Sequence, residues 1–412
     1  MVRLWTRFWG FIQSKNYEWK KYNIPLVSVV VLLSLISIFT LWVIGSGMNT
    51  SADFRKQLLG FTLGFIIMGI VSLIDYHFIC RYAAVYYILV SALVAATRFS
   101  PIGTDNRKGA YRWIRLPGFD LQPSELCKLM VIIALAVLFN KLQNKMETFW
   151  PLIWGVVVTS FPITFVLLQP DLSSSLVVVF IFAMMLYASG IAYKIILPVI
   201  IVTVPLLGVL FWYVLQPNSG ILHPYQVARI VGFMEPEKYP DEMFQQNMSI
   251  EAISSGKLYG KYIIEGTSDV RNYNKVDVTE SDFIWSAIGE EFGFIGSISI
   301  IIVLFVFIII CLFVAKNAVD YLGKMIAIGI ASMFMFQVFA NIGVATRMLP
   351  NTGLPLPFIS SGLSGLVTYM AAIGILLNIG IQPASKALGK GFLIKNNLHE
   401  LSDLKYDTDI TE

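Results

Sequence analysis

The sequence predicts an all-α polytopic membrane protein of about ten transmembrane helices, with one long outer loop between the seventh and eighth. Composition is the first observation: the 412 residues are 56% hydrophobic and 14% charged, with a mean hydropathy of +0.71, well above a soluble domain. The second is a series of ten apolar runs near the roughly 20 residues that a spanning helix needs. The runs are 24–46, 57–75, 78–97, 125–140, 150–168, 172–191, 194–215, 294–315, 323–345 and 364–383.

The ends of the chain predict its orientation. Residues 1–23 are basic and residues 386–412 form a polar, mostly acidic tail, with a ten-helix domain over 24–385 between them. Because Lys and Arg concentrate on the cytoplasmic side of membrane proteins, the basic N-terminus is predicted to be cytoplasmic. An even number of spans then places the C-terminus on the same side.

Two segments between spans are unusual. Residues 98–124 should lie outside, yet they carry several basic residues beside Trp113, against the usual trend. One interpretation is snorkelling to lipid headgroups, and the other is a cationic surface for a phosphate-bearing substrate. Residues 216–282 form the long outer loop, and loops of this length are usually functional or disordered. The basic residues of the first segment are Arg98, Arg107, Lys108, Arg112 and Arg115.

The stretch "TESDFIWSAIGEEFGFIG" places carboxylates at the entrance to the eighth span. Thr279 and Asp282 have the spacing of a capping box, and the pattern alone favours a helix cap for Asp282. Glu290 and Glu291 lie about 12 Å further along, among glycines that suggest irregular backbone lining a polar cavity. An ionisable residue inside a membrane segment is a functional hypothesis by default.

Further polar signals lie near the outer ends of other spans. Glu125 and Lys128 are three residues apart on one helix face, which is consistent with an ion pair. Asp171 precedes the sixth span, where it could cap the helix. A loop rich in Pro and Gly joins the ninth and tenth spans and carries Arg347. Acidic and basic groups therefore converge on the outer face.

Six motifs, in order over roughly residues 20 to 385, resemble the SEDS family (shape, elongation, division and sporulation), whose members include RodA, FtsW and SpoVE. Two stretches, "RKQLLGFTLGFIIMGIVSLIDYHF" and "PLPF", look closer to RodA than to FtsW. The six motifs are "YRWI", "LQPSELCKL", "QPDLSSSLV", "PYQVARIVGFMEP", "ESDFIWSAIGEEFGFIG" and "NIGVATRMLPNTGLPLPFISSG".

The resemblance implies a peptidoglycan glycosyltransferase that polymerises lipid II at the outer face of the cytoplasmic membrane of a bacterium, in elongation, division or sporulation. It implies a class B penicillin-binding protein as the transpeptidase partner, lipid II and membrane lipid as ligands, and no nucleic acid. Asp282 matches the family's catalytic aspartate, so the resemblance favours a general base over a cap, although the two roles are compatible.

The motifs also assign substrate-binding positions, including cations that would neutralise a departing diphosphate. Asp282, Glu290 and Glu291 could hold a divalent cation, but their spacing does not demand one, and no cofactor is predicted firmly. The assigned substrate-binding residues are Arg112, Trp113, Glu125, Lys128, Asp171, Gln226, Arg229, Glu290, Ser360 and Gly362.

The sequence departs from the family pattern around this site, at Glu280, Ser281, Arg347, Ser361 and Leu363. Arg347 stands where the family usually has glycine. Two alternatives to a polymerase are a lipid II flippase or other transporter, and a non-catalytic scaffold that activates a class B penicillin-binding protein. A transporter is disfavoured because no inverted repeat is visible. A scaffold predicts that Asp282→Ala leaves cell-wall function intact.

Overall fold

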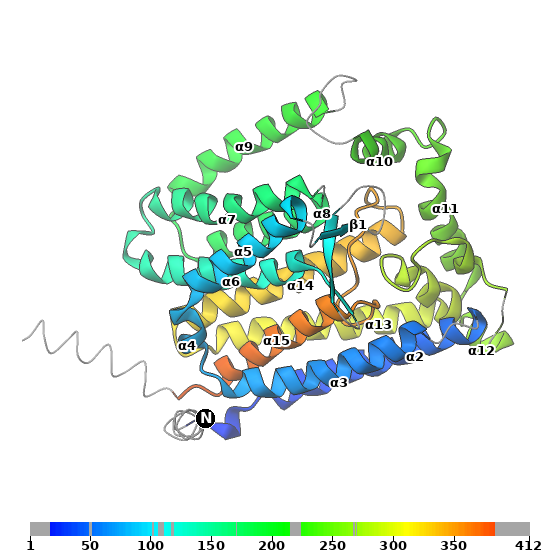
Figure 1. Ribbon diagram of the computed structural model, residues 1–412, viewed down its shortest axis with the longest axis horizontal. Coiled ribbons are helices and arrows are strands. Elements are labelled where there is room, and N and C mark those ends of the chain that lie inside the picture. The colour runs from blue at the N-terminus through cyan, green and yellow to red at the C-terminus, as the bar shows by residue number, and fades with distance from the viewer. Residues whose placement is uncertain are drawn as a thin grey trace, which may run out of the picture.

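The computed structural model describes most of the ten-helix domain (Figure 1). Residues 1–16 of the predicted basic segment 1–23 lie outside the described residues, as do Arg107, Lys108 and all residues from 384 onward, including the predicted tail 386–412. The described residues are 17–48, 52–100, 103–105, 111–116, 119–169, 171–214, 224–266, 268 and 270–383.

Within the described residues, ten long apolar helices run side by side, which confirms the predicted helical membrane fold. Eight are long and apolar enough to cross a membrane, and the other two are slightly shorter. The helices are α2 (Ile24–Met48), α3 (Ala52–Leu73), α5 (Ala83–Phe99), α6 (Pro123–Lys141), α7 (Trp150–Leu168), α8 (Leu172–Ala188), α9 (Tyr193–Val214), α13 (Ile284–Lys316), α14 (Tyr321–Ala345) and α15 (Leu363–Gly380).

The third and eighth spans differ from the predicted ranges. The third breaks at Tyr82, so that the short helix α4 (Tyr76–Arg81) precedes α5. The eighth, α13, begins ten residues earlier than predicted and kinks at Gly293, whose φ of +64° is a left-handed conformation that glycine adopts without strain. The kink separates the first turns of α13 from the long apolar run.

The centre of the bundle is α14, which packs against α6, α8 and α13, while α15 packs against α3. Burial follows this arrangement: 72% of the apolar window of α15 is buried, against 6% for α9. Helix α9 therefore lies at the edge, and Figure 1 shows it beside α7 with its far end standing away from the bundle. Pro198 and Pro205 interrupt its backbone hydrogen bonding.

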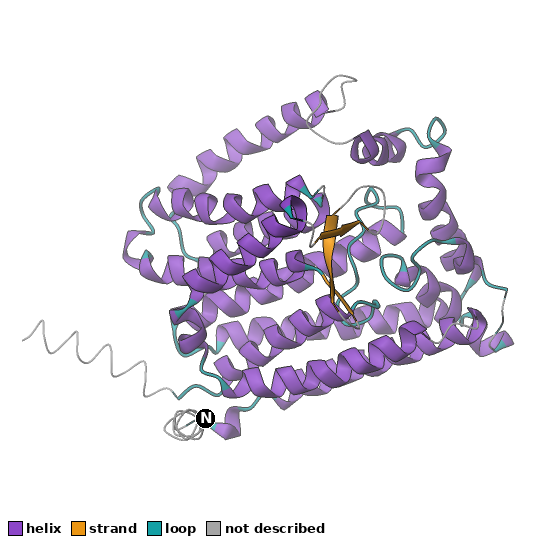
Figure 2. Ribbon diagram, viewed as in Figure 1, coloured by secondary structure: helices purple, strands orange, loops and turns teal. Residues whose placement is uncertain are grey.

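The connections at one end of the bundle carry additional structure, as Figure 2 shows. We call this end the loop face and define it by the strands and by loop 346–362. The strands form an antiparallel sheet of order β1-β2-β3 that a purely helical prediction did not include. The elements are β1 (Gly103–Asp105), β2 (Tyr111–Leu116) and β3 (Phe119–Leu121), with α10 (Pro224–Met234), α11 (Pro240–Ser255), α12 (Lys261–Glu265) and the 3₁₀ turn η3 (Asn272–Lys275) in the predicted long loop.

The opposite end, the termini face, holds α4, the turn at 317–320 and two 3₁₀ turns, η1 (Trp19–Lys21) and η2 (Gln143–Lys145). Here His77 bridges two carboxylates: Nδ1 lies 2.7 Å from Asp75 Oδ1 and Nε2 lies 2.7 Å from Asp320 Oδ2. Only an imidazolium carries a proton on both ring nitrogens, so only the charged form donates to both. Burial by itself lowers the pKa of His77, but the hydrogen bonds to Asp320 and Asp75 outweigh it and raise the pKa above 6.5.

This cluster predicts a pH-dependent stability. Because the folded pKa of His77 is raised, its contribution is fully present below about pH 6.5, the unfolded value, and is lost as pH rises through the folded pKa. We therefore expect the melting temperature of the detergent-solubilised protein to fall as pH rises from about 6.5 through the folded pKa of His77. In His77→Gln, which cannot titrate, that part of the decline should disappear. Equal slopes in the two proteins would contradict the assignment.

Candidate functional site

A cavity of about 570 Å³ opens at the loop face, among segments that are far apart in the sequence. Strand β2, the starts of α6, α8 and α15, the turn 278–282 and loop 353–362 all contribute to its walls. Three predicted site residues, Lys128, Arg229 and Glu290, are not among the described residues that line it, and the side chain of Gln226 lies outside the described residues. The predicted residues that line it are Arg112, Trp113, Glu125, Asp171, Asp282, Ser360 and Gly362.

Asp282 lies half-buried in a turn just before α13. The carbonyl of Val278 accepts hydrogen bonds from the N–H groups of Ser281, Asp282 and Phe283. The predicted capping box is wrong: α13 begins at Ile284, and Thr279 donates its hydroxyl to the carbonyls of Tyr273 and Val276 instead. The tight turn at Val278, whose φ is +57°, keeps Thr279 away from the helix start.

Loop 353–362 lies directly against this turn and holds it in place. The N–H of Ser361 donates to the carbonyl of Glu280 at 2.8 Å, and the hydroxyl of Ser360 donates to the carbonyl of Ser281. Gly353 faces the Asp282 carboxylate closely, because a Cβ atom there would lie 3.1 Å from Oδ2. Its φ is +69°, so glycine suits this position both for its backbone and for its size.

A buried ion pair lies against the cavity on α6. Lys128 Nζ donates to Glu125 Oε1 at 2.7 Å, which confirms the predicted pair, and Tyr369 donates its hydroxyl to Glu125 Oε2 at 3.2 Å. Lys128 is fully buried and does not line the cavity, whereas Glu125 and Tyr369 do. The ammonium group therefore contacts the cavity wall through Glu125.

Asp171 and Arg112 complete the polar wall. The Asp171 carboxylate accepts the N–H of Ser174 at 3.1 Å and its hydroxyl at 2.8 Å, which confirms the predicted N-cap of α8. Arg112 Nε donates to the carbonyl of Gln169 at 3.1 Å and thereby ties β2 to the end of α7. These bonds fix a cation and an anion on the same side of the cavity.

Glu290 and Glu291 lie away from the cavity, in a buried network that fastens residues 271–273 to α13. Glu290 pairs with Lys261 and accepts the N–H groups of Asn272 at 3.0 Å and Tyr273 at 2.9 Å. Glu291 accepts Arg271 Nε and the Tyr273 hydroxyl, both at 2.9 Å. Both carboxylates thus have protein partners, and the described part of the chain holds no group of three His, Cys, Asp or Glu that could hold a metal ion.

Two other predicted residues lie on α10. The side chain of Gln226 is outside the described residues, and Arg229 is half-buried but is not among the residues that line the cavity. Sequence reasoning missed Leu354, Ser364 and Tyr369, which do line it. A tyrosine hydroxyl in the middle of an apolar span was the available signal for Tyr369, because such a group needs a buried hydrogen-bond partner.

Arg347, one of the departures from the family pattern, has a left-handed backbone with a φ of +56°. This conformation favours glycine, the residue that the family usually has there. Arg347 donates from Nη1 to Asn247 Oδ1 at 3.2 Å. The substitution thus keeps a glycine-like backbone and adds a link to α11.

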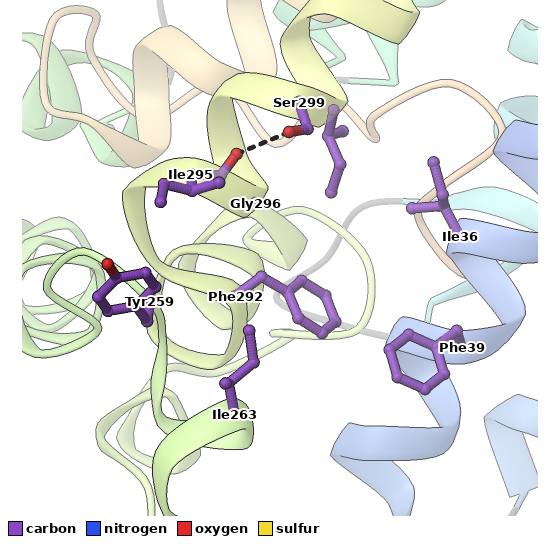
Figure 3. Close-up of a pocket in the computed structure, with 9 residues that line it drawn as sticks. Ile36, Phe39, Tyr259, Ile263, Phe292, Ile295, Gly296 and Ser299 are labelled. Atoms are coloured by element: carbon purple, nitrogen blue, oxygen red, sulfur yellow. Dashed lines mark hydrogen bonds between the residues drawn. The ribbon is translucent and has the colours of Figure 1, made fainter.

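A second cavity, of about 350 Å³, lies between α2, α12 and α13 near the Gly293 kink. Figure 3 shows Ile36 and Phe39 of α2 across from Ile263 and Phe292. The described residues that line it include no charged group, and the hydroxyl of Ser299 donates to the carbonyl of Ile295. Of these two cavities, only the one of about 570 Å³ is lined by charged side chains from several segments, and we call it the polar cavity.

The fold and this cavity define a polytopic membrane protein with a polar site at one end of its helix bundle. The sequence profile described as "Cell cycle protein", FTSW_RODA_SPOVE, matches residues 21–384. The chain therefore belongs to the FtsW/RodA/SpoVE family of SEDS proteins.

Individual relatives agree with this assignment. The probable peptidoglycan glycosyltransferase FtsW of Trichlorobacter lovleyi is 33% identical over 379 residues, covering 89% of this chain and 95% of the relative. The peptidoglycan glycosyltransferase MrdB of Escherichia coli K12 is 28% identical over 375 residues, covering 89% and 96%. A solved structure titled "Structural coordination of polymerization and crosslinking by a peptidoglycan synthase complex" aligns with a TM-score of 0.73 at 24% identity, covering 87% and 97%. The prediction that the chain is closer to RodA than to FtsW gains no support, because the FtsW relative is 33% identical and MrdB, which groups with RodA, is 28% identical.

Proposed function

We propose that Asp282 is the general base with which this peptidoglycan glycosyltransferase polymerises lipid II into glycan strands for cell-wall synthesis. The enzyme class follows from membership of the family. The observation that carries the role of Asp282 is its place in the polar cavity, opposite Gly353 and in the same cavity as Arg112. A carboxylate beside a cation suits a reaction that removes a proton and releases an anion.

The reaction joins two sugars in a single displacement at the anomeric carbon of the donor. The 4-hydroxyl oxygen of the acceptor sugar forms a bond to the anomeric carbon of the donor, and the bond from that carbon to undecaprenyl diphosphate breaks. The hydroxyl proton passes to the Asp282 carboxylate, and the bonding pair leaves with the diphosphate. Arg112, on the cavity wall, stabilises the departing charge. One displacement converts an α-linked donor into a β link, and the diphosphate needs little protonation to leave.

The orientation and partner belong to the same proposal. The termini face is cytoplasmic and the loop face, with the cavity, is outside. Basic residues at helix ends of the termini face support this orientation, among them Arg81, Lys141 and Lys316. A class B penicillin-binding protein is the partner, supported by a structural relative whose title names a synthase complex that coordinates polymerization and crosslinking.

The test is glycan-chain formation from purified lipid II by the protein with its cognate penicillin-binding protein, whose transpeptidase is blocked. Polymer from the wild type and none from Asp282→Asn supports the proposal. Polymer from both proteins would remove Asp282 as the base. Polymer from neither, in a folded and partnered preparation, would contradict the polymerase and favour the scaffold or the transporter.

Gly353→Ala provides an independent test of the cavity geometry. The added Cβ atom would lie 3.1 Å from Asp282 Oδ2 and would displace the carboxylate by a few tenths of an ångström. Because misplacing a reacting group by about 1 Å can cost about 10²-fold, we expect a fall in polymerisation rate of about 10-fold. The rate would be measured with lipid II.

Gly266→Ala is the matched control for Gly353→Ala. Gly266 also has a positive φ, of +73°, so alanine is strained there too, but no atom of the described residues lies within 4 Å of its added Cβ. Gly266→Ala should therefore show a similar loss of stability with a normal rate. Equal rates in the two variants would show that contact with Asp282 is unimportant.

A further inference from the structure

We infer that Asn341 is a positioning residue that sets the direction of the Asp282 side chain; this inference rests on the proposed role of Asp282 as the base. Asn341 lies near the end of α14, the central helix, and its side chain is buried. Its amide nitrogen donates to the carbonyl of Asp282 at 2.8 Å and to the carbonyl of Leu354 at 2.7 Å. One amide group thus joins the turn that carries Asp282 to the loop that carries Gly353 and Leu354.

The bond completes a row of three. The carbonyls of Glu280, Ser281 and Asp282 accept from Ser361 N–H, the Ser360 hydroxyl and the Asn341 amide, in that order. Ser360 and Ser361 belong to loop 353–362 and line the cavity. Asn341 does not line the cavity and is the donor that connects this turn to the rigid centre of the bundle.

The carbonyl of Asp282 lies just before α13, where a regular α-helix would use it as a hydrogen-bond acceptor. In a regular α-helix the N–H of Ser286 would bond to the carbonyl of Asp282, but it bonds to the carbonyl of Phe283 at 2.9 Å instead. With its own carbonyl held by Asn341, Asp282 stays outside α13. Its side chain then lies next to Gly353 rather than turning onto the helix face.

A primary amide is suited to this task because its NH₂ group carries two hydrogens, one for each carbonyl. An aspartate of the same shape would present only acceptors to two acceptors, and alanine would present nothing. The Asn341 Oδ1 atom is buried and has no hydrogen-bond partner within the described part of the chain. The two donated bonds therefore orient the side chain.

The experiment compares Asn341→Ala and Asn341→Asp with wild type in the full chain with its penicillin-binding protein. We expect kcat for lipid II polymerisation to fall by about 10- to 100-fold, because the base is misplaced, while KM changes less than about two-fold, because substrate contacts remain. A purely structural residue would alter the amount of folded enzyme without this split. If one of the two variants does not fold, the kcat per folded enzyme of the other decides the matter.

Asn378→Ala is the matched control. Asn378 is a buried amide on α15 at the termini face, where it donates to the carbonyl of Ser72 at 2.8 Å. Its removal should lower the melting temperature and leave kcat per folded enzyme unchanged. Unchanged kcat in both Asn341 variants, with Asp282→Asn inactive, would overturn the positioning role alone. An active Asp282→Asn would instead overturn the proposed base.

Discussion

Asp282→Asn is expected to lower the rate of glycan polymerisation by about 10²–10⁴-fold, the usual contribution of a general base. The amide has nearly the same shape but cannot accept the proton of the attacking hydroxyl. The fold should survive, because the turn is held by main-chain bonds of residues 280–282 that the substitution leaves in place. The measurement is polymer formed from lipid II per folded enzyme, with a melting curve for each protein.

Asp277→Asn is the matched control for this variant. Asp277 lies five residues earlier in the same connection, is exposed and does not line the cavity. Its side chain contacts only the amide of Gln245 among the hydrogen bonds of the described residues, at 3.4 Å. The same chemical change should therefore leave the rate near that of the wild type. A similar loss in both variants would indicate a general effect of removing a negative charge from this connection.

Lys128→Met is expected to have the largest effect on stability. Lys128 is fully buried and pairs with the buried Glu125 at 2.7 Å. Removing one member of such a pair leaves an uncompensated charge and typically costs about 3–5 kcal/mol. We expect a clear fall in melting temperature together with loss of polymerisation, because Glu125 on the cavity wall would lose its counterion.

The double variant Glu125→Gln, Lys128→Met separates the two effects. Removing both charges avoids the unpaired carboxylate, so most of the lost stability should return. Activity should stay low, because neither the carboxylate on the cavity wall nor the cation behind it is restored. A double variant as unstable as Lys128→Met would show that packing, rather than charge, explains the loss.

Structural features that depend only on residues close together in the chain could be predicted from the sequence. The apolar runs predicted the spanning helices because the bilayer core requires about 20 apolar residues whatever the surrounding structure. The Glu125–Lys128 pair and the Asp171 cap depend on residues three apart, so one turn of helix is enough to bring them together. The spanning helices and their local polar contacts can therefore be predicted from short segments of the sequence.

The sequence by itself thus determined the class of protein, the spans and seven of the residues that meet in the cavity. Only the tertiary structure decided what surrounds Asp282. The predicted capping box does not form because the left-handed turn at Val278 directs Thr279 away from the helix start. Glu290 lies outside the cavity because it bonds to Lys261 and to the backbone of residues 272 and 273. Asn341 meets Asp282 across 59 residues of chain. Such contacts arise from the packing of separate helices and loops, and no local pattern encodes them.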